Sequence, residues 1–573
     1  MKRSIVLAFA LLMLPVSACA QPDTAPASVS HNAESQRIPG VVSAADPRAA
    51  EAGQEILRAG GSATDAAMAM MLVLTVVEPQ SSGIGGGGFF VRHDAESGTA
   101  TTIDGRETAP STATAALFLT EDGEEMGFRQ AVPGGRSIGI PGNMRLMAEA
   151  HRRWGRLDWA QIFAPAIRHA EEGYTVNARM ARFLGFFSEI WNDFPDTRAI
   201  YWEDGAPKEE GDIVRNPALA ALLRRLADEG ADAFYSGENV AAIQAAAGNS
   251  VHNPTVIPTE DFTNYRAIER APVCREYRVY RICGMGPPSS GATTVLQILG
   301  MLERFDMGAL GAQSPEAWHL IGEAMRLAYA DRAMYLGDMD FVSVPVEGLL
   351  ADSYIAERSA LISSDSAIGT YEAGTPPGSE ARTAGLDGEI AGTTHFVAAD
   401  SSGNVVTMTS TIEGPFGSQL VANGYFLNNE LTDFDFTPER DGAPVANAVA
   451  PGKRPLSSMS PTLVYDADGN LVLALGSAGG RRIIMHVTKT LIGVLDWGLP
   501  VDEAIALPNI YFGGDSLRIE QDSYLAEMQT ELSQRSGLVV ASNLTSKVNA
   551  IQWTGDGWLG AADPRSPGIA LTE

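Results

Sequence analysis

Cysteine, basic residues and long apolar runs are all scarce in this sequence, and each scarcity excludes a class of protein. Only three of the 573 residues are cysteine, with no CxxC pair and no Cys/His cluster, which argues against a structural zinc site. The 41 basic residues stand against 70 acidic ones, a net charge of −29 that excludes nucleic acid as a partner and disfavours docking on anionic lipid. No apolar run is long enough for a polytopic membrane protein.

What remains is typical of a large globular protein. Charged residues make up 19% of the chain, below the usual fraction of about 25%. Glycine and proline, 59 and 32 residues, are common enough to predict a compact, turn-rich chain instead of a disordered one.

The N-terminus has the pattern of an export signal. Two basic residues precede ten apolar ones, Ile5 to Leu14, and small residues follow. Val16–Cys19 resembles a bacterial lipobox, which would lipidate Cys19, whereas Ala18–Ala20 also fits ordinary secretory cleavage. We therefore expect residues 1–19 to be a signal peptide and the protein to be exported to the periplasm on a lipid anchor, with plain secretion as the alternative. Residues 20–40, rich in Ala, Pro and Ser, read as a flexible tether.

The two remaining cysteines lie at mirror positions of a predicted hairpin. A turn at Arg278-Val279 would place Cys274 directly opposite Cys283 in a non-hydrogen-bonded pair. In an exported protein this arrangement predicts a cross-strand disulfide. Two buried free thiols are the alternative, because Arg-Val is a poor turn dipeptide.

Helical patterns dominate the first two thirds of the chain. Asp46-Pro47 begins one helix, which Gly60-Gly61 ends, and Ser62 with Asp65 opens a very apolar one that ends at Val77. A glycine run, 83–88, then leads into a strand at 89–92. Its GxGxxG spacing does not indicate a dinucleotide site, because such a site needs the order strand, glycines, helix. Further helices are expected at 142–154, 159–172, 315–334 and 482–496.

Strands dominate the last third. Residues 371–392 are aperiodic and rich in Gly, Pro and Ser, which predicts an exposed, mobile connection. Two hairpins follow, 394–399 with 405–412 and 462–465 with 471–475. The turn 466–470 lacks the glycine and the glutamate of a calcium loop. Helices followed by paired strands indicate an α+β fold, with helices layered over sheets.

Two motifs in this part carry little weight. Gly514–Leu517 resembles a lipase motif with Ser516 as the nucleophile, but no histidine follows His486, so a surface turn is the better interpretation. The eight histidines show no metal-ligand spacing, and His395 is expected to be structural.

Gly392-Thr393 can carry chemistry if the chain is cut between these residues. Thr393 would then have a free α-amine with a pKa near 8, which can act as general base for the hydroxyl of the same residue. Gly392 suits self-cleavage, because its small size lets the hydroxyl approach the preceding carbonyl. The same residues also fit an ordinary turn into a strand.

Several longer segments support the first interpretation. They are Glu78–Gly88, Asp104–Pro110, Pro287–Gly291, Gly392–His395, Leu427–Phe434, Lys453–Pro461 and Gly476–Gly480. In order and content these segments resemble the γ-glutamyltransferase family of self-cleaving N-terminal-nucleophile hydrolases. The resemblance implies a four-layer αββα sandwich built from a large subunit, residues 41–392, and a small catalytic subunit, residues 393–573, both from one precursor.

The resemblance also implies roles for single residues. Thr393 would be the nucleophile of both processing and catalysis, Thr411 would orient it, and the N–H groups of Gly479 and Gly480 would form an oxyanion hole. Arg106, Ser457 and Ser458 would bind the α-carboxylate of the substrate, whereas Glu430 and Asp433 would bind its α-ammonium. The implied enzyme uses no cofactor and no metal.

One residue departs from the family pattern. Glu413 stands where many members carry Asn, and an ionised Glu only accepts hydrogen bonds. This carboxylate should weaken binding of the substrate's own carboxylate unless it turns away or pairs with a cation. The segment 433–457, where some members carry a lid, also looks short, which would favour water or bulky acceptors.

These features predict an exported enzyme that cleaves γ-glutamyl amides such as glutathione and passes the acyl group to water, an amino acid or a peptide. A cephalosporin (glutaryl) acylase-like amidohydrolase with the same Thr393 is the first alternative. An uncleaved, inactive solute-binding lipoprotein is the second.

Overall fold

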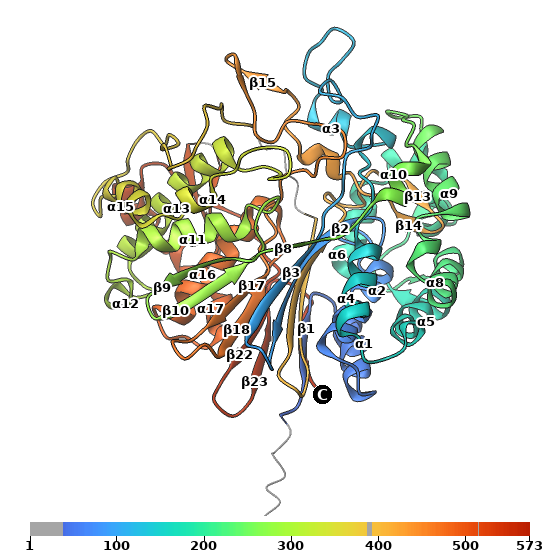
Figure 1. The fold of residues 1–573 in the computed structure, drawn as a ribbon, viewed down its shortest axis with the longest axis horizontal. Helices are drawn as coiled ribbons and strands as arrows, with labels where there is room; N and C mark the ends of the chain where they lie inside the picture. Colours follow the sequence, from blue (N-terminus) through green and yellow to red (C-terminus); the bar gives the residue numbers. More distant parts are fainter. Residues whose placement is uncertain (1–37, 387–391, 514) are drawn as a thin grey trace, which may run out of the picture. The chain divides into compact units, whose positions relative to one another are not determined.

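Two central β-sheets with helices on both outer sides form the body of the protein (Figure 1). The structure is a computed structural model that describes residues 38–386, 392–513 and 515–573. The signal segment 1–19 with Cys19, the tether up to residue 37, residues 387–391 and Gly514 lie outside the described residues. The four-layer αββα architecture expected from the sequence is confirmed.

The first sheet has seven strands, and all its neighbours are antiparallel. Both of its faces are buried, so side chains of β11 alternate between two cores: Phe396 and Ala398 face one, Val397 and Ala399 the other. The strand order is β24 (Ile569–Thr572), β1 (Val41–Ala44), β11 (Thr394–Ala399), β12 (Val405–Thr411), β2 (Gly87–Asp94), β3 (Thr99–Gly105) and β8 (Ile268–Arg270).

The second sheet has six strands and contains the cysteine hairpin. Cys274 pairs with Cys283 across the hairpin, their Cα atoms lie 4.1 Å apart, and a disulfide joins them. Arg278 forms the turn with a φ of 56°, a conformation unusual for a residue with a side chain. The strand order is β23 (Trp558–Ala562), β22 (Asn549–Trp553), β18 (Leu471–Gly476), β17 (Thr462–Tyr465), β10 (Tyr280–Gly284) and β9 (Val273–Tyr277).

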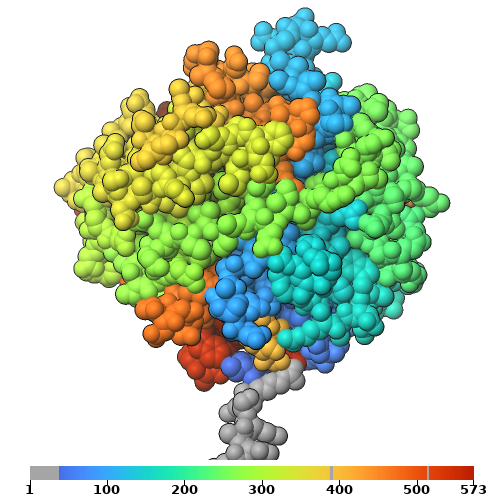
Figure 2. All heavy atoms as spheres, in the orientation of Figure 1, coloured from blue at the N-terminus to red at the C-terminus, as the bar shows by residue number. Residues whose placement is uncertain are grey.

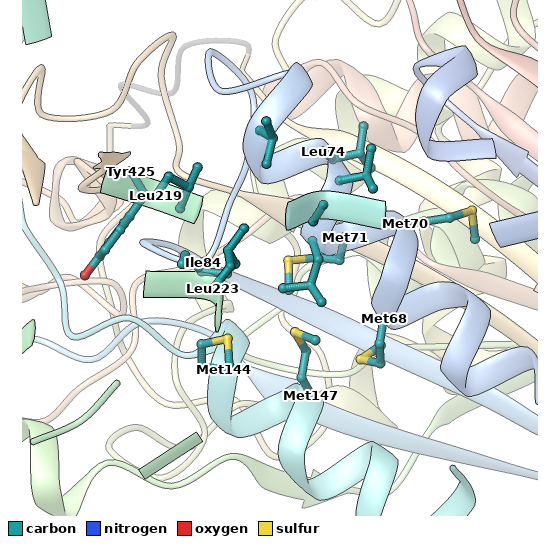
Figure 3. Close-up of a cluster of buried hydrophobic side chains, with 14 of the residues drawn as sticks. Met68, Met70, Met71, Leu74, Ile84, Met144, Met147, Leu219, Leu223 and Tyr425 are labelled. Carbon is teal, nitrogen blue, oxygen red and sulfur yellow. The ribbon is translucent and has the colours of Figure 1, made fainter. Parts of the chain in front are cut away.

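Helices cover the outer face of each sheet. Ser62 and Asp65 form a full capping box at the start of α2, and every residue of α2 is buried. Its methionines belong to the same buried core as Met144 and Met147, and Met71 lies on the side of α2 that faces these two (Figure 3). The helices on this side include α1 (Pro47–Arg58), α2 (Ala63–Val77), α4 (Asn143–Trp154), α5 (Ala164–Glu172) and α8 (Pro217–Glu229); those over the second sheet include α11 (Gly291–Leu302), α13 (Pro315–Tyr335) and α16 (Ile483–Leu495).

One predicted helix has a different start. The stretch 159–172 begins as a 3₁₀ turn, Trp159–Phe163, and becomes α-helical only at Ala164. Pro165 explains the change, because proline has no N–H for a bond to the preceding turn and is tolerated only where a helix begins.

Shorter elements connect these layers, and none of the helices in the described ranges has both the length and the apolar composition to cross a bilayer. The other helices are α3 (Phe128–Ala131), α6 (Ala178–Phe186), α7 (Pro195–Tyr201), α9 (Gly237–Gly248), α10 (Thr259–Asn264), α12 (Met307–Leu310), α14 (Val346–Leu349), α15 (Asp352–Ala360), α17 (Val501–Ala506), α18 (Tyr524–Glu527) and α19 (Gln529–Ser536); small sheets use β13 (Val421–Ala422), β14 (Tyr425–Phe426), β15 (Glu439–Arg440), β16 (Ala443–Pro444), β19 (Ile510–Gly513), β20 (Ser516–Glu520) and β21 (Val539–Ser542).

Both large sheets mix strands from either side of Gly392. In the first sheet, β1 lies between β11 and β24, so a strand from the front of the chain is hydrogen-bonded on both edges to strands from its end. In the second sheet, one edge of β10 pairs with β17, so strands from before and after Gly392 are neighbours there too. The segments before and after Gly392 are therefore interleaved in one body.

Candidate active site

Thr393 and Thr411 face each other where strands β11 and β12 meet. The hydroxyl oxygens of the two residues are 3.3 Å apart, and the Thr411 hydroxyl donates to the carbonyl oxygen of Gly392 at 2.9 Å. The backbone N–H of Glu413 in turn donates to the Thr411 hydroxyl at 2.8 Å. Because Thr411 gives its single proton to the Gly392 carbonyl, its oxygen is left to accept from Thr393, which orients the Thr393 hydroxyl beside the Gly392–Thr393 peptide.

Glycines allow the backbone to pack tightly around this pair. A Cβ added to Gly392 would lie 2.6 Å from the carbonyl oxygen of Glu413, and one added to Gly86 would lie 2.0 Å from that of Thr411. A Cβ on Gly85 would likewise lie 2.0 Å from the carbonyl oxygen of Phe426. The glycine run before β2 thus serves close backbone packing, as the sequence order of helix, glycines and strand indicates.

Arg106 is buried against two acidic residues. Its guanidinium pairs with Glu430 and with Asp433, the latter at 2.5 Å, and also donates to the carbonyl oxygens of Pro455 and Leu456 at 3.1 and 2.9 Å. Burial alone would lower the pKa of Arg106, but the neighbouring carboxylates outweigh it and raise the pKa above its usual value. The structure therefore brings together the residues expected to bind the two charges of a substrate. Here the basic residue, Arg106, pairs directly with the acidic ones, Glu430 and Asp433.

Glu107 adds a third carboxyl group beside the same guanidinium. Its side chain is fully buried, and its Oε2 lies 4.0 Å from Nη1 of Arg106. Burial is the main cause that raises the pKa of Glu107 to about 7, with the Arg106 charge opposing it. The Arg106 guanidinium thus lies within 4.0 Å of three carboxyl groups, those of Glu107, Glu430 and Asp433.

Ser457 and Ser458 lie in a loop held by the Pro287–Gly291 segment. The carbonyl of Ser457 accepts hydrogen bonds from the N–H and the hydroxyl of Ser290, both at 2.7 Å. Arg332 of α13 donates to the Ser290 hydroxyl at 2.8 Å and to the Ser458 hydroxyl at 2.9 Å. The sequence analysis missed Arg332; the signal that could have found it is a charged residue on the apolar face of a helix.

Gly479 and Gly480 form the turn between β18 and α16. Their φ angles are +135° and +60°, values that favour glycine at both positions. The preceding strand is tied to β12, because the Thr407 hydroxyl donates to the carbonyl of Leu475 at 3.2 Å. The turn is thus anchored to the strand that ends in Thr411.

His395 stabilises the same junction. Its ring nitrogens contact the hydroxyls of Thr409 and Thr407 at 2.8 and 3.1 Å, and a Cβ on Gly476 would lie 2.3 Å from the ring. Burial lowers the pKa of His395 to about 3, which keeps the ring neutral. These contacts fit the structural role expected from the sequence.

Glu413 is buried with an amide as partner. Its φ is +73°, and Nδ2 of Asn429 donates to its carboxylate, while Oδ1 of Asn429 accepts from the N–H of Gly414 at 2.9 Å. No sequence pattern predicts that Asn429 is the hydrogen-bond partner of Glu413. The Glu413 carboxylate therefore lies close to Thr411 in sequence and accepts a hydrogen bond from the neutral amide of Asn429.

The weaker sequence motifs lie in ordinary secondary structure. Ser516 begins β20 and pairs with Gly513 of β19, while Gly514 of the same motif lies outside the described residues. Asp466 accepts from the backbone N–H groups of Asp468 and Asn470, so its carboxylate closes a β-turn. Within the described part of the chain, no group of three or more His, Cys, Asp or Glu side chains is arranged to hold a metal ion.

The segment after Asp433 packs on the front part of the chain. Thr437 and Arg440 contact Glu125 at 3.0 and 2.8 Å. Figure 2 shows this small-hairpin region, in orange, beside the blue segment that contains Glu125. The expectation that the short segment 433–457 leaves the site open to water or bulky acceptors stays a prediction.

Comparisons with known proteins show what this chain is similar to. The sequence model described as gamma-glutamyltranspeptidase matches residues 49–572. A glutathione hydrolase proenzyme of Bacillus subtilis (strain 168) is 36% identical over 503 residues, which cover 86% of this chain and 84% of that protein. A glutathione hydrolase proenzyme of Escherichia coli (strain K12) is 36% identical over 542 residues, covering 92% and 90%.

A solved structure is similar over most of its length. The cephalosporin acylase from Bacillus halodurans superposes with a TM-score of 0.82 at 26% identity, covering 93% of this chain and 96% of that one. Relatives of both enzymatic types considered in the sequence analysis therefore share this fold.

Proposed function

Because the chain belongs to the gamma-glutamyltranspeptidase family, we propose that it cuts its own backbone before Thr393 and then cleaves γ-glutamyl amides such as glutathione. The larger piece would contain the large subunit, 41–392, and the smaller piece would be the small subunit, 393–573. The observation that carries the proposal is the hydrogen-bonded set formed by Thr393, Thr411 and the Gly392 carbonyl. The proenzyme names of its relatives support synthesis as an inactive precursor.

The proposed self-cleavage uses this geometry. The Thr393 hydroxyl attacks the carbonyl carbon of Gly392, and Thr411 stabilises the oxyanion that develops on the oxygen it already contacts. The C–N bond then breaks, the Thr393 nitrogen takes up the proton that the hydroxyl has lost and becomes an amine, and Gly392 is left as an ester on the Thr393 oxygen. Water hydrolyses this ester and releases the Gly392 carboxylate and a free Thr393.

The same hydroxyl then performs the enzymatic reaction. The new α-amine accepts the hydroxyl proton, and the oxygen attacks the γ-carbonyl carbon of the substrate. The amide C–N bond breaks, the leaving amine takes the proton, and a γ-glutamyl ester forms on Thr393. Water, an amino acid or a peptide amine attacks this ester and frees the enzyme. We propose that Gly479 and Gly480 stabilise the oxyanion of both steps.

The charges around Arg106 favour a zwitterionic substrate. A γ-glutamyl group brings a carboxylate for Arg106 and an ammonium for Glu430 and Asp433, so it can replace the internal ion pairs without leaving a charge unpaired. A glutaryl group brings only a carboxylate and would leave these two acids without a cation.

Initial rates on two anilides test the substrate class. We expect purified, processed protein to turn over γ-glutamyl-p-nitroanilide with kcat/KM at least about 100-fold above that of glutaryl-p-nitroanilide, since an unpaired buried charge costs about 3 kcal/mol or more. Free nitroaniline measured by absorbance gives both rates. Faster cleavage of the glutaryl compound would instead assign the chain to the acylase type.

Glu413 offers a second prediction at this site. Glu413→Gln keeps an oxygen for the Asn429 amide but removes a negative charge near the substrate carboxylate, so kcat/KM for the γ-glutamyl anilide should rise about tenfold. Glu413→Asn is expected to change it in the same direction. Glu125→Gln, on the exposed hairpin contact, is the control. An unchanged kcat/KM in both Glu413 variants would place this side chain outside the binding pocket.

We also propose that the protein is exported and lipid-anchored through Cys19, with plain secretion as the alternative. The basic, apolar and small-residue order of the first 20 residues supports this proposal. The intact mass of the large piece distinguishes a lipidated Cys19 from an unmodified N-terminus.

A further inference from the structure

A buried histidine lies directly behind the turn that contains Gly479 and Gly480. His486 is in the first turns of α16 and is 1% exposed. Its Nδ1 lies 3.0 Å from the hydroxyl oxygen of Ser477, and this hydroxyl also lies within 3.2 Å of the carbonyl oxygen of Ala478. The imidazole and the serine thus connect the helix to the strand side of the turn.

The ring also fills the space behind Gly479. A Cβ added to Gly479 would lie 3.0 Å from Cε1 and 3.6 Å from Nδ1 of His486, so the ring is in packing distance of the turn backbone. The Arg482 side chain also donates to the carbonyl oxygen of Gly479 at 3.4 Å. The turn is therefore in contact with both the imidazole ring and the Arg482 side chain.

Such support is needed because the turn is made of flexible residues. Two successive glycines with positive φ have more alternative conformations than any other pair, so their backbone N–H directions are not fixed locally. A donor stabilises an oxyanion only when its N–H points at the position where the charge develops.

We propose that His486, acting through Ser477, is a positioning residue that fixes the Gly479–Gly480 turn for oxyanion stabilisation. This inference rests on the proposed function of that turn. The ring acts in its neutral form, since burial, together with the charges of Arg482, Lys489 and Arg565, keeps the pKa of His486 well below its usual value. A neutral ring can donate from Nδ1 to Ser477, which then donates to the Ala478 carbonyl.

The test separates kcat from KM in matched variants. His486→Ala should lower kcat for the γ-glutamyl anilide about 30-fold, per mole of chain that begins at Thr393, with KM changed less than twofold. His486→Asn places an amide nitrogen near the position of Nδ1 and should restore kcat to within about threefold of the wild type.

His319→Ala is the matched control. His319 is also fully buried with Nδ1 at 2.8 Å from a serine hydroxyl, that of Ser536, so its loss reports the general cost of removing such a pair. We expect kcat and KM of this variant to stay within twofold of the wild type, although both alanine variants lose thermal stability.

The outcomes distinguish the inference from the proposed function. If the wild type is active but His486→Ala and His319→Ala have equal kcat values, the role of His486 is overturned and the proposed function stands. The same conclusion would follow if His486→Ala raised KM without lowering kcat. A wild type that is processed but inactive on the γ-glutamyl anilide would overturn the proposed function and the inference with it. If His486→Ala does not fold, Ser477→Ala removes only the linking hydroxyl; it should lower kcat about tenfold at constant KM, and an unchanged kcat would overturn the proposal.

Discussion

Thr393→Ala is expected to leave a single uncut polypeptide with no measurable γ-glutamyl transfer. The variant lacks the hydroxyl that the Thr411 contact places beside the Gly392 carbonyl, and without cleavage no α-amine forms to act as base. Wild-type protein should instead show two bands on denaturing electrophoresis, the smaller one with the N-terminal sequence Thr-Thr-His.

Two neighbouring substitutions serve as controls. Thr393→Ser keeps a hydroxyl and should still be cut, more slowly because the serine side chain rotates more freely. Thr394→Ala removes the next hydroxyl along β11 and should be cut normally. A wild-type chain that stays intact for days would contradict the mechanism and favour the uncleaved, solute-binding lipoprotein.

Thr411→Val should slow self-cleavage by about 100-fold to 1,000-fold, the effect of losing one oxyanion-hole donor in other enzymes. It should also slow turnover, because the Thr393 hydroxyl loses the contact that orients it. Valine has nearly the shape of threonine, so the strand is preserved while the bond to the Gly392 carbonyl and the contact with the Thr393 hydroxyl are both lost. The time course of band conversion after synthesis measures the first rate, and anilide cleavage by the processed fraction measures the second.

Thr409→Val is the control on the same strand. It removes a hydroxyl that contacts His395 at 2.8 Å, so it costs stability without touching the Gly392 carbonyl. We expect cleavage close to the wild-type rate. Equal slowing in the two valine variants would mean that Thr411 acts through strand stability and not through its hydroxyl.

Local signals in the sequence were enough to predict much of the fold. The hairpin of β11 and β12 follows from two alternating runs around Asp400–Asn404, and the caps of α1 and α2 follow from Asp46-Pro47 and Ser62. Strands β1 and β24 gave no such signal. Each has only four residues, and each is a strand because its partner, hundreds of positions away, supplies the hydrogen bonds.

The contacts of the candidate site also include some that local sequence signals predict and some that depend on distant parts of the chain. Thr393 and Thr411 could be placed near each other because they lie at facing ends of one hairpin, whose register the turn sets. The mutual pairing of Arg106 with Glu430 and Asp433 could not be predicted, because it depends on two loops more than 300 positions apart approaching each other. The resemblance to the family named these residues, but not their contacts in the uncut chain.

Because strands from before and after Gly392 are interleaved, a cut at that point would change how the protein can refold. An uncut chain folds as one molecule, whereas two severed pieces that came apart would have to find each other again, at a rate that depends on their concentration. Each piece alone would expose unpaired strand edges, such as β11 without β1, which invite aggregation. If the chain is cut as proposed, the peptide bond before Thr393 keeps the two pieces together only while they fold. After the cut, the height of the unfolding barrier would set the lifetime of the enzyme.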